Sequence, residues 1–258
     1  MAEVLAGLGE IAEDRILDGR LTLLQPKRGH RAGSDAVLLA ATLPELGPGP
    51  LLDMGAGVGT IGLIAALAQP ELRVALLERD PGLAALAARN AAANGFGNRV
   101  RVIAADLAAP AAELEQAGLA TASFACVALN PPFYAAGEAR LSPVANRRAA
   151  HVVETPLSVW LKTARRLLMP GGRLALIHRA EALPEVLSGL GVGFGGLGVR
   201  PVHAAADRPA IRILVSATLG SKKPAALLPA LVLQAEDGAM TTLSEALHRG
   251  TATLRPDG

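Results

Sequence analysis

The 258-residue sequence has one cysteine, few aromatic residues and no long apolar run. Cys126 cannot form an intrachain disulfide, and it lies in an apolar run where a buried, unreactive thiol is expected. Apolar stretches such as 37–43 fall far short of the roughly 20 residues that span a bilayer. Residues 1–10 lack the basic start and apolar core of a secretory signal. We therefore expect a cytoplasmic protein without a membrane partner.

Metal-ligand patterns and strong net charge are also lacking. His30, His178, His203 and His248 show no metal-ligand spacing with one another or with Cys126, so no metal is predicted. The net charge is only +2, although the sequence pI is about 9. This balance permits a nucleic-acid partner without demonstrating one. With 51% apolar and 19% charged residues, the chain has the composition of an ordinary folded domain.

From residue 50 onward, short apolar runs alternate with alanine-rich helical windows, a pattern typical of βαβ units. Strands are expected at 51–54, 74–77, 100–103, 124–129 and 174–177, with a closing pair at 199–202 and 211–218. Asp80 is expected to cap one helix before a proline at its first position, Pro81, and Asn94-Gly95 to end that helix. Thr155-Pro156 is expected to begin another helix in the same way, with Thr155 as the cap. The predicted fold is α/β, with a Rossmann-like, seven-stranded and mostly parallel sheet.

The residues before this pattern predict a short extension. A strand at 20–24 is expected to pair with a partner near His30 through a turn at 26–29. Ser34 then precedes a helical stretch at 35–43, and its hydroxyl is expected to cap that helix.

The first strand of the βαβ pattern ends in a glycine-rich turn, Asp-Met-Gly-Ala-Gly-Val-Gly-Thr at 53–60. Glycines at a strand-to-helix turn let the backbone approach a ligand closely. Gly57, Gly59 and Gly62 also match the dinucleotide fingerprint. A carboxylate at Asp53 would repel a pyrophosphate, whereas S-adenosylmethionine brings an ammonium and a sulfonium. The charge therefore favours S-adenosylmethionine over a nicotinamide cofactor.

Three acids follow the first three strands: Asp53, Glu78 and Asp106. The carboxyl ends of parallel strands converge on one crevice. We therefore expect these carboxylates to meet the methionine part, the ribose hydroxyls and the adenine amine, respectively.

The fourth strand ends in Asn130-Pro131-Pro132-Phe133. Two prolines stiffen the backbone and remove amide donors, which leaves carbonyls free to accept. The Asn130 side chain and the Pro131 carbonyl are expected to hold an NH2 group by both hydrogens, with its nitrogen facing the methyl donor. Hydrogen bonds that favour a pyramidal nitrogen raise its nucleophilicity in the transition state. Phe133 offers a flat surface for stacking a base or amide.

These motifs resemble those of class I S-adenosylmethionine-dependent methyltransferases with an N-P-P-[FY] motif, over residues from about 17 to about 218. Within that group the sequence is most similar to bacterial tRNA adenine-N6 methyltransferases that act beside the anticodon of a valine tRNA. Residues 24–26 and 31–39 carry this part of the resemblance, because Gly33-Ser34-Asp35 resembles a glycine-threonine-aspartate stretch in that family. Serine here stands in place of threonine.

The resemblance implies methylation of the N6 amine of an adenine in tRNA, with Glu78 as ribose ligand, Asp106 as adenine ligand and residues 33–35 closing over the donor. The predicted catalytic residues are Asn130, Pro131, Pro132 and Phe133. The predicted cofactor-binding residues are Gly33, Ser34, Asp35, Asp53, Gly55, Ala56, Gly57, Gly59, Glu78, Arg79, Asp106, Leu107 and Asn130.

Basic residues near the two ends of the chain are candidates for contacts with RNA phosphates. One basic rim at the mouth of the crevice is expected from the N-terminal hairpin and the final strands, with a scattered solvated surface as the alternative. The predicted substrate-contacting residues are Lys27, Arg31, Arg147, His151, Lys222 and Lys223.

Three other functions remain open. The same tetrapeptide would serve methylation of another RNA base or of a protein glutamine amide. Glutamine methyltransferases usually carry a separate N-terminal helical domain, for which the thirty-odd residues before the first helix are too few. A non-catalytic S-adenosylmethionine-binding subunit is the third, and the intact Asn130 to Phe133 stretch argues against it.

The predicted organisation is an N-terminal hairpin and helix extension at 1–45, a cofactor-binding methyltransferase domain at 46–220, and a C-terminal tail at 221–258 that packs on or extends that domain.

Overall fold

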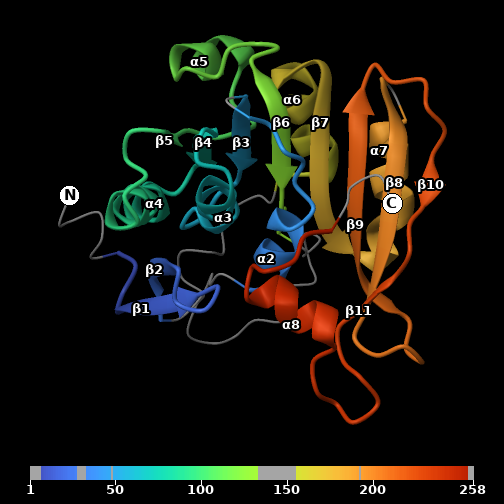
Figure 1. Ribbon diagram of the computed structural model, residues 1–258. Coiled ribbons are helices and arrows are strands. Elements are labelled where there is room, and N and C mark those ends of the chain that lie inside the picture. Colours follow the sequence, from blue (N-terminus) through green and yellow to red (C-terminus); the bar gives the residue numbers. More distant parts are fainter. Residues whose placement is uncertain (1–6, 28–32, 48, 133–154, 192, 255–258) are drawn as a thin grey trace.

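A computed structural model describes residues 7–27, 33–47, 49–132, 155–191 and 193–254 (Figure 1). Its central sheet has the strand order β5-β4-β3-β6-β7-β9-β8. These strands are β3 (Pro50–Met54), β4 (Arg73–Glu78), β5 (Val100–Ala104), β6 (Phe124–Leu129), β7 (Leu168–Arg179), β8 (Phe194–His203) and β9 (Ala210–Leu219). β9 runs antiparallel to both of its neighbours, and the pairings from β5 to β7 are all parallel. The predicted Rossmann-like sheet is confirmed.

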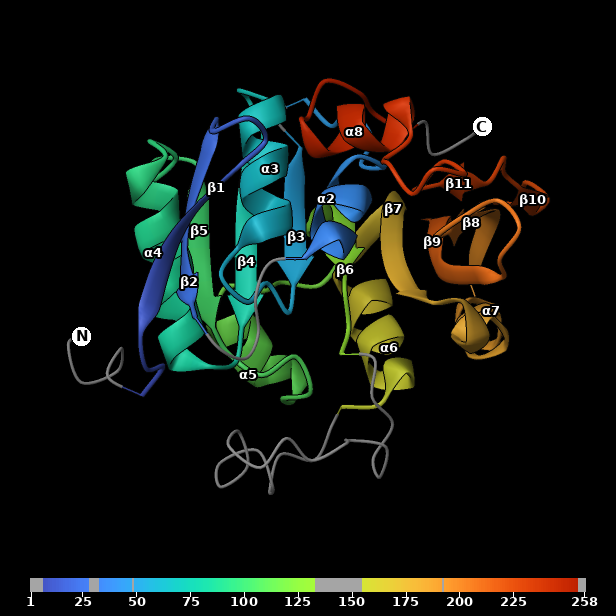
Figure 2. The ribbon, with the colours of Figure 1, turned by 90° about the horizontal axis from the view of Figure 1, so that it is seen from below.

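Helices cover both faces of this sheet (Figure 2). One face carries α2 (Ser34–Ala40), α3 (Thr60–Ala68), α4 (Pro81–Ala93) and α8 (Thr242–His248), and the other carries α5 (Ala111–Gln116), α6 (Leu157–Leu167) and α7 (Leu183–Leu190). Successive strand residues point to opposite faces, so Leu51 and Leu52 are both fully buried but belong to different apolar clusters. Strands buried on both faces explain the continuous apolar runs in the sequence.

The N-terminal hairpin is formed by β1 (Ile11–Ile16) and β2 (Leu21–Pro26). The predicted partner near His30 was wrong, because β2 pairs with a strand that precedes it in the chain, and His30 lies outside the described residues. The reversal occurs at Leu17, Asp18 and Gly19, which all have positive φ values. Asp-Gly is a strong turn dipeptide, and it was the signal that the sequence offered.

The helix ends confirm some predicted caps and correct others. Asp80 Oδ1 accepts hydrogen bonds from the amides of Gly82 at 2.8 Å and Leu83 at 2.9 Å, as predicted. Ser34 does not cap α2, because it is the first residue of that helix and Gly33 is the N-cap. For α6 the N-cap is Pro156, with no side-chain cap bond, so the predicted Thr155 cap was also wrong.

Residues after β9 add two short strands and a helix. β10 (Ala226–Leu227) and β11 (Leu231–Val232) both pair in parallel with β8. The Leu254 amide donates to the Ala41 carbonyl at 2.7 Å, and Arg20 Nη2 donates to the carbonyls of Arg249 and Gly250. Residues 249–254 thus pack on the end of α2 and on the hairpin turn, while the division of the chain at residues 45 and 220 stays a prediction.

Three further predictions from the sequence concern Cys126, membrane-spanning helices and metal sites. Cys126 is fully buried, and this burial raises the pKa of its thiol to about 12. In the part of the chain that the structure describes, no helix has both the length and the apolar character to cross a membrane. Within the same ranges, no group of three or more His, Cys, Asp or Glu is arranged to hold a metal ion.

Candidate functional site

The sheet register brings the predicted ligand-binding segments to one edge. Met54, the last residue of β3, pairs with Leu77 of β4 and with Leu129 of β6. The residues that follow these three positions, Gly55, Glu78 and Asn130, therefore lie side by side at the carboxyl edge of the sheet. Glu78 also pairs with Ala104, so that Asp106 follows at the same edge. This convergence is the arrangement in which open α/β sheets bind ligands.

The glycine-rich turn is rigidly held. Gly55, Gly57 and Gly59 have φ values of +75°, +57° and +90°, which L-residues with a Cβ rarely adopt. The amides of Gly55 and Ala56 donate to the Leu77 carbonyl at 2.8 and 2.9 Å, and the Gly59 amide donates to the Ala56 carbonyl at 2.8 Å. A Cβ added at Gly57 would meet no atom within 4 Å, so the turn has an open surface there.

Glu78 is oriented by the turn. Its Oε2 accepts from the Gly57 amide at 2.8 Å, and its Oε1 accepts from the Asp80 amide at 2.8 Å. The residue is only 8% exposed. Each carboxylate oxygen has more than one lone pair, so an oriented Glu78 can also accept from hydroxyl groups of a ligand. The neighbouring Arg79 is exposed.

Asp53 lies inside the protein and does not face the crevice. It is fully buried, and its Oδ2 accepts from the Gly62 amide in the first turn of α3 at 2.9 Å. Its Oδ1 has no hydrogen-bond partner among the described residues. Burial raises the pKa of Asp53 to about 7, the Gly62 amide opposes this shift, and the Glu78 carboxylate adds to it. This burial does not agree with the predicted contact between Asp53 and a ligand. The carboxylate is covered by α3 and does not reach the surface of the crevice.

The other predicted residues at this edge differ in exposure. Asp106 is exposed and its Oδ1 accepts from the Ala108 amide at 2.8 Å, whereas Leu107 is buried. Asn130 is half-buried, Pro131 is buried and Pro132 is exposed. Phe133 lies outside the described residues, so its predicted stacking role stays a prediction.

The segment predicted to close over the ligand begins α2. Gly33 and Ser34 are exposed and line a pocket of about 380 Å³ together with Thr60, the first residue of α3. Asp35 forms an ion pair with Arg212 of β9, with Oδ2 and Nε 3.0 Å apart. This ion pair joins α2 to the carboxyl edge of the sheet, because Arg212 pairs in register with Arg179 at the end of β7.

Comparisons with known proteins agree with this geometry. Residues 31–190 match the family described as "Methyltransferase small domain". The chain belongs to this family. A protein of Porphyromonas gingivalis named "tRNA1(Val) (adenine(37)-N6)-methyltransferase" is 35% identical over 161 residues, which cover 60% of this chain and 61% of that protein. A protein of the same name from Aeromonas hydrophila is 32% identical, with coverages of 61% and 63%. The matched part is thus about three fifths of the length of these relatives.

The fold of this methyltransferase small domain also resembles a solved structure. A predicted O-methyltransferase from Agrobacterium tumefaciens superposes with a TM-score of 0.73 at 28% sequence identity. The superposition covers 86% of this chain and 98% of that chain. The likeness therefore extends beyond the residues that match the family description.

The structure divides the basic residues near the final strands, because Arg212 lies at the carboxyl edge whereas Lys222 and Lys223 do not. β9 starts at the carboxyl edge and carries the chain back, so Lys222 and Lys223 follow its end at the opposite edge. Arg200 is buried in β8 and donates to the Pro229 carbonyl at 2.6 Å. Lys27 is exposed and forms an ion pair with Glu10, with Nζ and Oε1 2.7 Å apart. Arg31, Arg147 and His151 lie outside the described residues.

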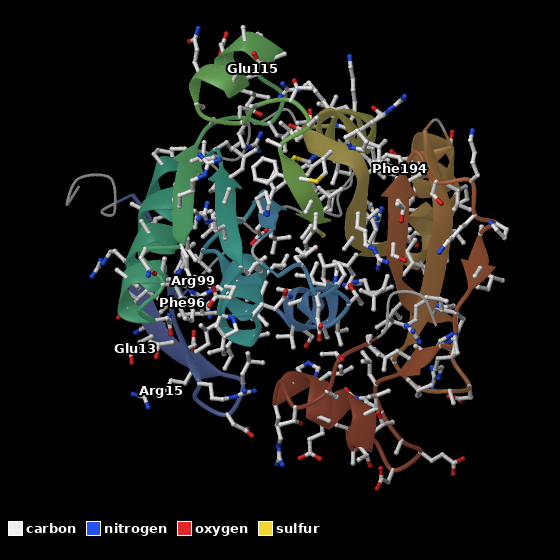
Figure 3. All side chains as sticks on the ribbon, turned by 45° about the horizontal axis from the view of Figure 1, so that its top comes forward. Glu13, Arg15, Phe96, Arg99, Glu115 and Phe194 are labelled. Carbon is white, nitrogen blue, oxygen red and sulfur yellow. The ribbon has the colours of Figure 1, made fainter. Side chains whose placement is uncertain are left out.

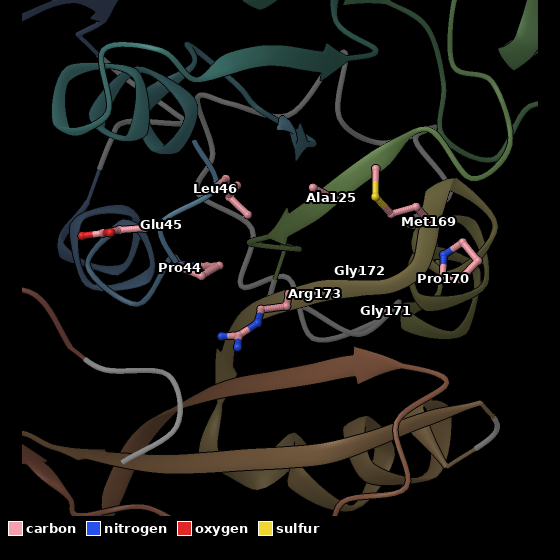
Figure 4. Close-up of a pocket in the computed structure, with 9 residues that line it drawn as sticks. All are labelled: Pro44, Glu45, Leu46, Ala125, Met169, Pro170, Gly171, Gly172 and Arg173. Carbon is pink, nitrogen blue, oxygen red and sulfur yellow. The ribbon is translucent and has the colours of Figure 1, made fainter. Parts of the chain in front are cut away.

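A pocket of about 520 Å³ lies away from the candidate site (Figure 4). It is lined by Ala125, the second residue of β6, and by residues 169–173 at the start of β7. The starts of these strands form the amino edge of the sheet, opposite Asn130. Its size alone therefore does not make it the ligand site of this methyltransferase small domain.

Sequence reasoning missed Trp160, the only tryptophan of the chain. Trp160 lies in α6, is 6% exposed, and donates through Nε1 to the Thr155 carbonyl at 3.2 Å. A Cβ added at Gly55 would overlap its indole ring, so the indole supports the start of the glycine turn. The rarity of aromatic residues in this chain was the signal that could have identified it.

Replacement of Asp53 by asparagine is expected to change the pH dependence of stability. A raised carboxyl pKa means that stability from Asp53 is fully present below its unfolded pKa of about 3.8 and is lost as pH rises through about 7. Asparagine can still accept from Gly62 but does not ionise. Urea unfolding of both proteins between pH of about 4 and 8 should show that Asp53→Asn gains stability relative to the wild type as pH rises. A pH-independent difference would contradict the raised pKa.

Proposed function

We propose that this protein transfers the methyl group of S-adenosylmethionine to the N6 amine of an adenine in tRNA. The observation that carries the proposal is the position of Asn130-Pro131-Pro132 directly beside the glycine turn and Glu78. The names of the relatives from Porphyromonas gingivalis and Aeromonas hydrophila support the choice of tRNA and of the adenine amine.

The described residues fit S-adenosylmethionine at this edge. The open surface at Gly57 leaves room for a ligand against the backbone, and the Glu78 carboxylate, which two amides hold in place, would accept from the ribose hydroxyls. Asp106 would reach the adenine amine, and Gly33 to Asp35 would lie over the methionine part. When bound, this cofactor supplies an electrophilic methyl group on a sulfonium.

Asn130 and Pro131 supply the positioning of the attacking nitrogen. The Asn130 side-chain oxygen and the Pro131 carbonyl would accept the two hydrogens of the amine and favour a pyramidal nitrogen. The amine becomes acidic only as the new bond forms, so the reaction needs no strongly perturbed general base. Rate enhancement then comes mainly from positioning. An adenine in an RNA loop must be splayed out of its stack to reach Asn130, and Phe133 would stack against it.

The cofactor assignment predicts a loss of affinity in a Glu78 variant. Glu78→Gln keeps one acceptor oxygen but replaces the other by a donor, so it loses either the Gly57 bond or the Asp80 bond. We expect S-adenosylmethionine to bind about 10- to 100-fold more weakly, as a hydrogen bond to a charged group is worth about 1.5–3 kcal/mol. Calorimetry measures this directly. Unchanged affinity, or tight binding of NAD by the wild type, would contradict the assignment.

Glutamine methylation and a non-catalytic role are alternatives that the same site allows. A comparison of RNA from cells with and without the gene distinguishes adenine methylation in tRNA from these alternatives. Digestion to nucleosides and mass spectrometry should show N6-methyladenosine in the tRNA fraction of wild-type cells and its loss in the deletion strain. An unchanged nucleoside pattern, with loss of a methylated glutamine in a protein, would overturn the RNA assignment.

A further inference from the structure

Asn90 in α4 and Asn94, the C-cap of that helix, bind the backbone of β2 as a neighbouring strand would. The Asn94 side chain accepts from the Thr22 amide at 2.9 Å and donates to the Thr22 carbonyl at 2.7 Å. One helical turn earlier, the Asn90 side chain accepts from the Leu24 amide at 2.7 Å and donates to the Leu24 carbonyl at 3.0 Å. Thr22 and Leu24 are alternate strand residues, so both present their backbone groups on the same edge of β2.

These bonds fix one edge of the hairpin against α4. The other side of the hairpin faces solvent, where Glu13 and Arg15 point away from the protein (Figure 3). The end of α4 is held in turn by Phe96, which is buried, and by Arg99, whose guanidinium carbon lies 4.7 Å from the Phe96 ring centroid. Arg99 also donates to the carbonyls of Ala66, Gln69 and Leu72 at and just after the end of α3.

Asn90 makes one bond that Asn94 does not make. Its Nδ2 also donates to the Val58 carbonyl in the glycine turn at 3.0 Å. Asn90 is fully buried, and both of its Nδ2 hydrogens are used, one toward β2 and one toward the turn. The peptide between Val58 and Gly59 is therefore held at both ends, because the Gly59 amide donates to Ala56.

We propose that Asn90 is a positioning residue for the cofactor turn, and that through Asn90 the N-terminal hairpin is a structural part of the cofactor site. The identity of the ligand in this proposal rests on the proposed function. The hairpin fixes the Asn90 amide, and the amide fixes the carbonyl of the residue between Gly57 and Gly59. The peptide lies between two glycines with positive φ, and the Asn90 bond holds its carbonyl while the bond to Ala56 holds its amide, so loss of the Asn90 bond frees one of its two ends.

Removal of the Asn90 amide should act on cofactor affinity more than on the chemical step. Without the bond, the turn samples other orientations in the free protein, and binding must restore the single orientation that fits the ligand. Once the cofactor is bound, the turn is ordered again and Asn130 is unaffected. The expected signature is a raised KM for S-adenosylmethionine with a kcat changed by less than about twofold.

Asn94 provides the matched control. It is the C-cap of the same helix, binds the same strand with the same kind of backbone bonds, and makes no bond to the glycine turn among the described contacts. Asn94→Ala therefore loosens the hairpin without releasing Val58. A difference between the two alanine variants isolates the bond to the turn.

The test compares Asn90→Ala and Asn94→Ala in the full chain by two readouts. Hydrogen exchange of the cofactor-free proteins should be faster over residues 54–62 in Asn90→Ala alone, while both variants exchange faster over β2. Calorimetry with S-adenosylmethionine should give a dissociation constant raised about tenfold in Asn90→Ala, the size of one net hydrogen bond, and within about twofold of the wild type in Asn94→Ala.

Equal exchange over residues 54–62 in the two variants, or equal losses of affinity, would overturn the proposal. If Asn90→Ala does not fold, Asn90→Ser and Asn94→Ser are compared in the same way, since serine retains one donor and one acceptor. The exchange measurement needs no ligand. A wild type that binds no S-adenosylmethionine would therefore contradict the proposed function, while the exchange result still decides the role of Asn90.

Discussion

Asn130→Ala should lower kcat about 100- to 1000-fold, the effect of removing one oriented hydrogen-bonding group from a reacting centre. The Asn130 side chain follows β6 beside the glycine turn, where its oxygen would accept a hydrogen of the attacking amine. This acceptor matters most as the nitrogen becomes pyramidal, so kcat and kcat/KM for tRNA should fall together. Steady-state kinetics with purified tRNA measure both constants.

S-adenosylmethionine affinity is the control for this variant. Glu78 and the glycine turn belong to other segments and keep their hydrogen bonds in Asn130→Ala. The dissociation constant measured by calorimetry should therefore stay within about threefold of the wild type. A loss of cofactor affinity as large as the loss of kcat would give Asn130 a structural role instead.

Gly55→Ala is expected to destabilise the protein by about 2–4 kcal/mol. A Cβ at this position would overlap the Trp160 indole, and overpacking of a core costs about 1–3 kcal/mol. The backbone φ of +75° adds about 1 kcal/mol for a residue with a Cβ. Urea unfolding of the cofactor-free protein measures the total change in free energy.

Gly57→Ala is the matched variant in the same turn. Its φ of +57° carries a similar backbone cost, but a Cβ there meets no atom within 4 Å. We expect a loss of only about 1 kcal/mol in stability, together with weaker binding of S-adenosylmethionine, because the Cβ projects into the open surface. Equal destabilisation by the two alanines would show that overlap with Trp160 contributes nothing to the change in the free energy of unfolding.

Sequence patterns predicted the parts of the fold that depend on residues close together in the chain. The strand at Phe124–Leu129 was predicted with its observed bounds, because a strand buried on both faces is a continuous apolar run. Asp80 was predicted as a cap, because its carboxylate needs only the amides two and three residues later. The glycine turn, Glu78 and Asn130 were predicted to share one edge, and the register of β3, β4 and β6 places them there.

Contacts between distant segments account for what the sequence did not reveal. Asp53 and Glu78 are both buried acids at strand ends. Only the three-dimensional structure shows that Asp53 binds the Gly62 amide of α3, whereas Glu78 binds the Gly57 amide of the turn. Lys222 was assigned to the wrong edge because the direction of β9 depends on its antiparallel pairing with β7. Asn90 has no local signal in the sequence, since its side chain makes three hydrogen bonds to two distant residues, Leu24 of β2 and Val58 of the glycine turn.

The proposed activity is tested most directly with purified protein, S-adenosylmethionine carrying a deuterated methyl group, and unmodified tRNA. The tRNA is digested after the reaction, and its nucleosides are analysed by mass spectrometry. We predict that the labelled methyl group appears on N6-methyladenosine, at one adenine, and that it is absent when S-adenosylmethionine is omitted. Label on any other nucleoside, or no label in RNA while a glutamine peptide is methylated, would contradict the account.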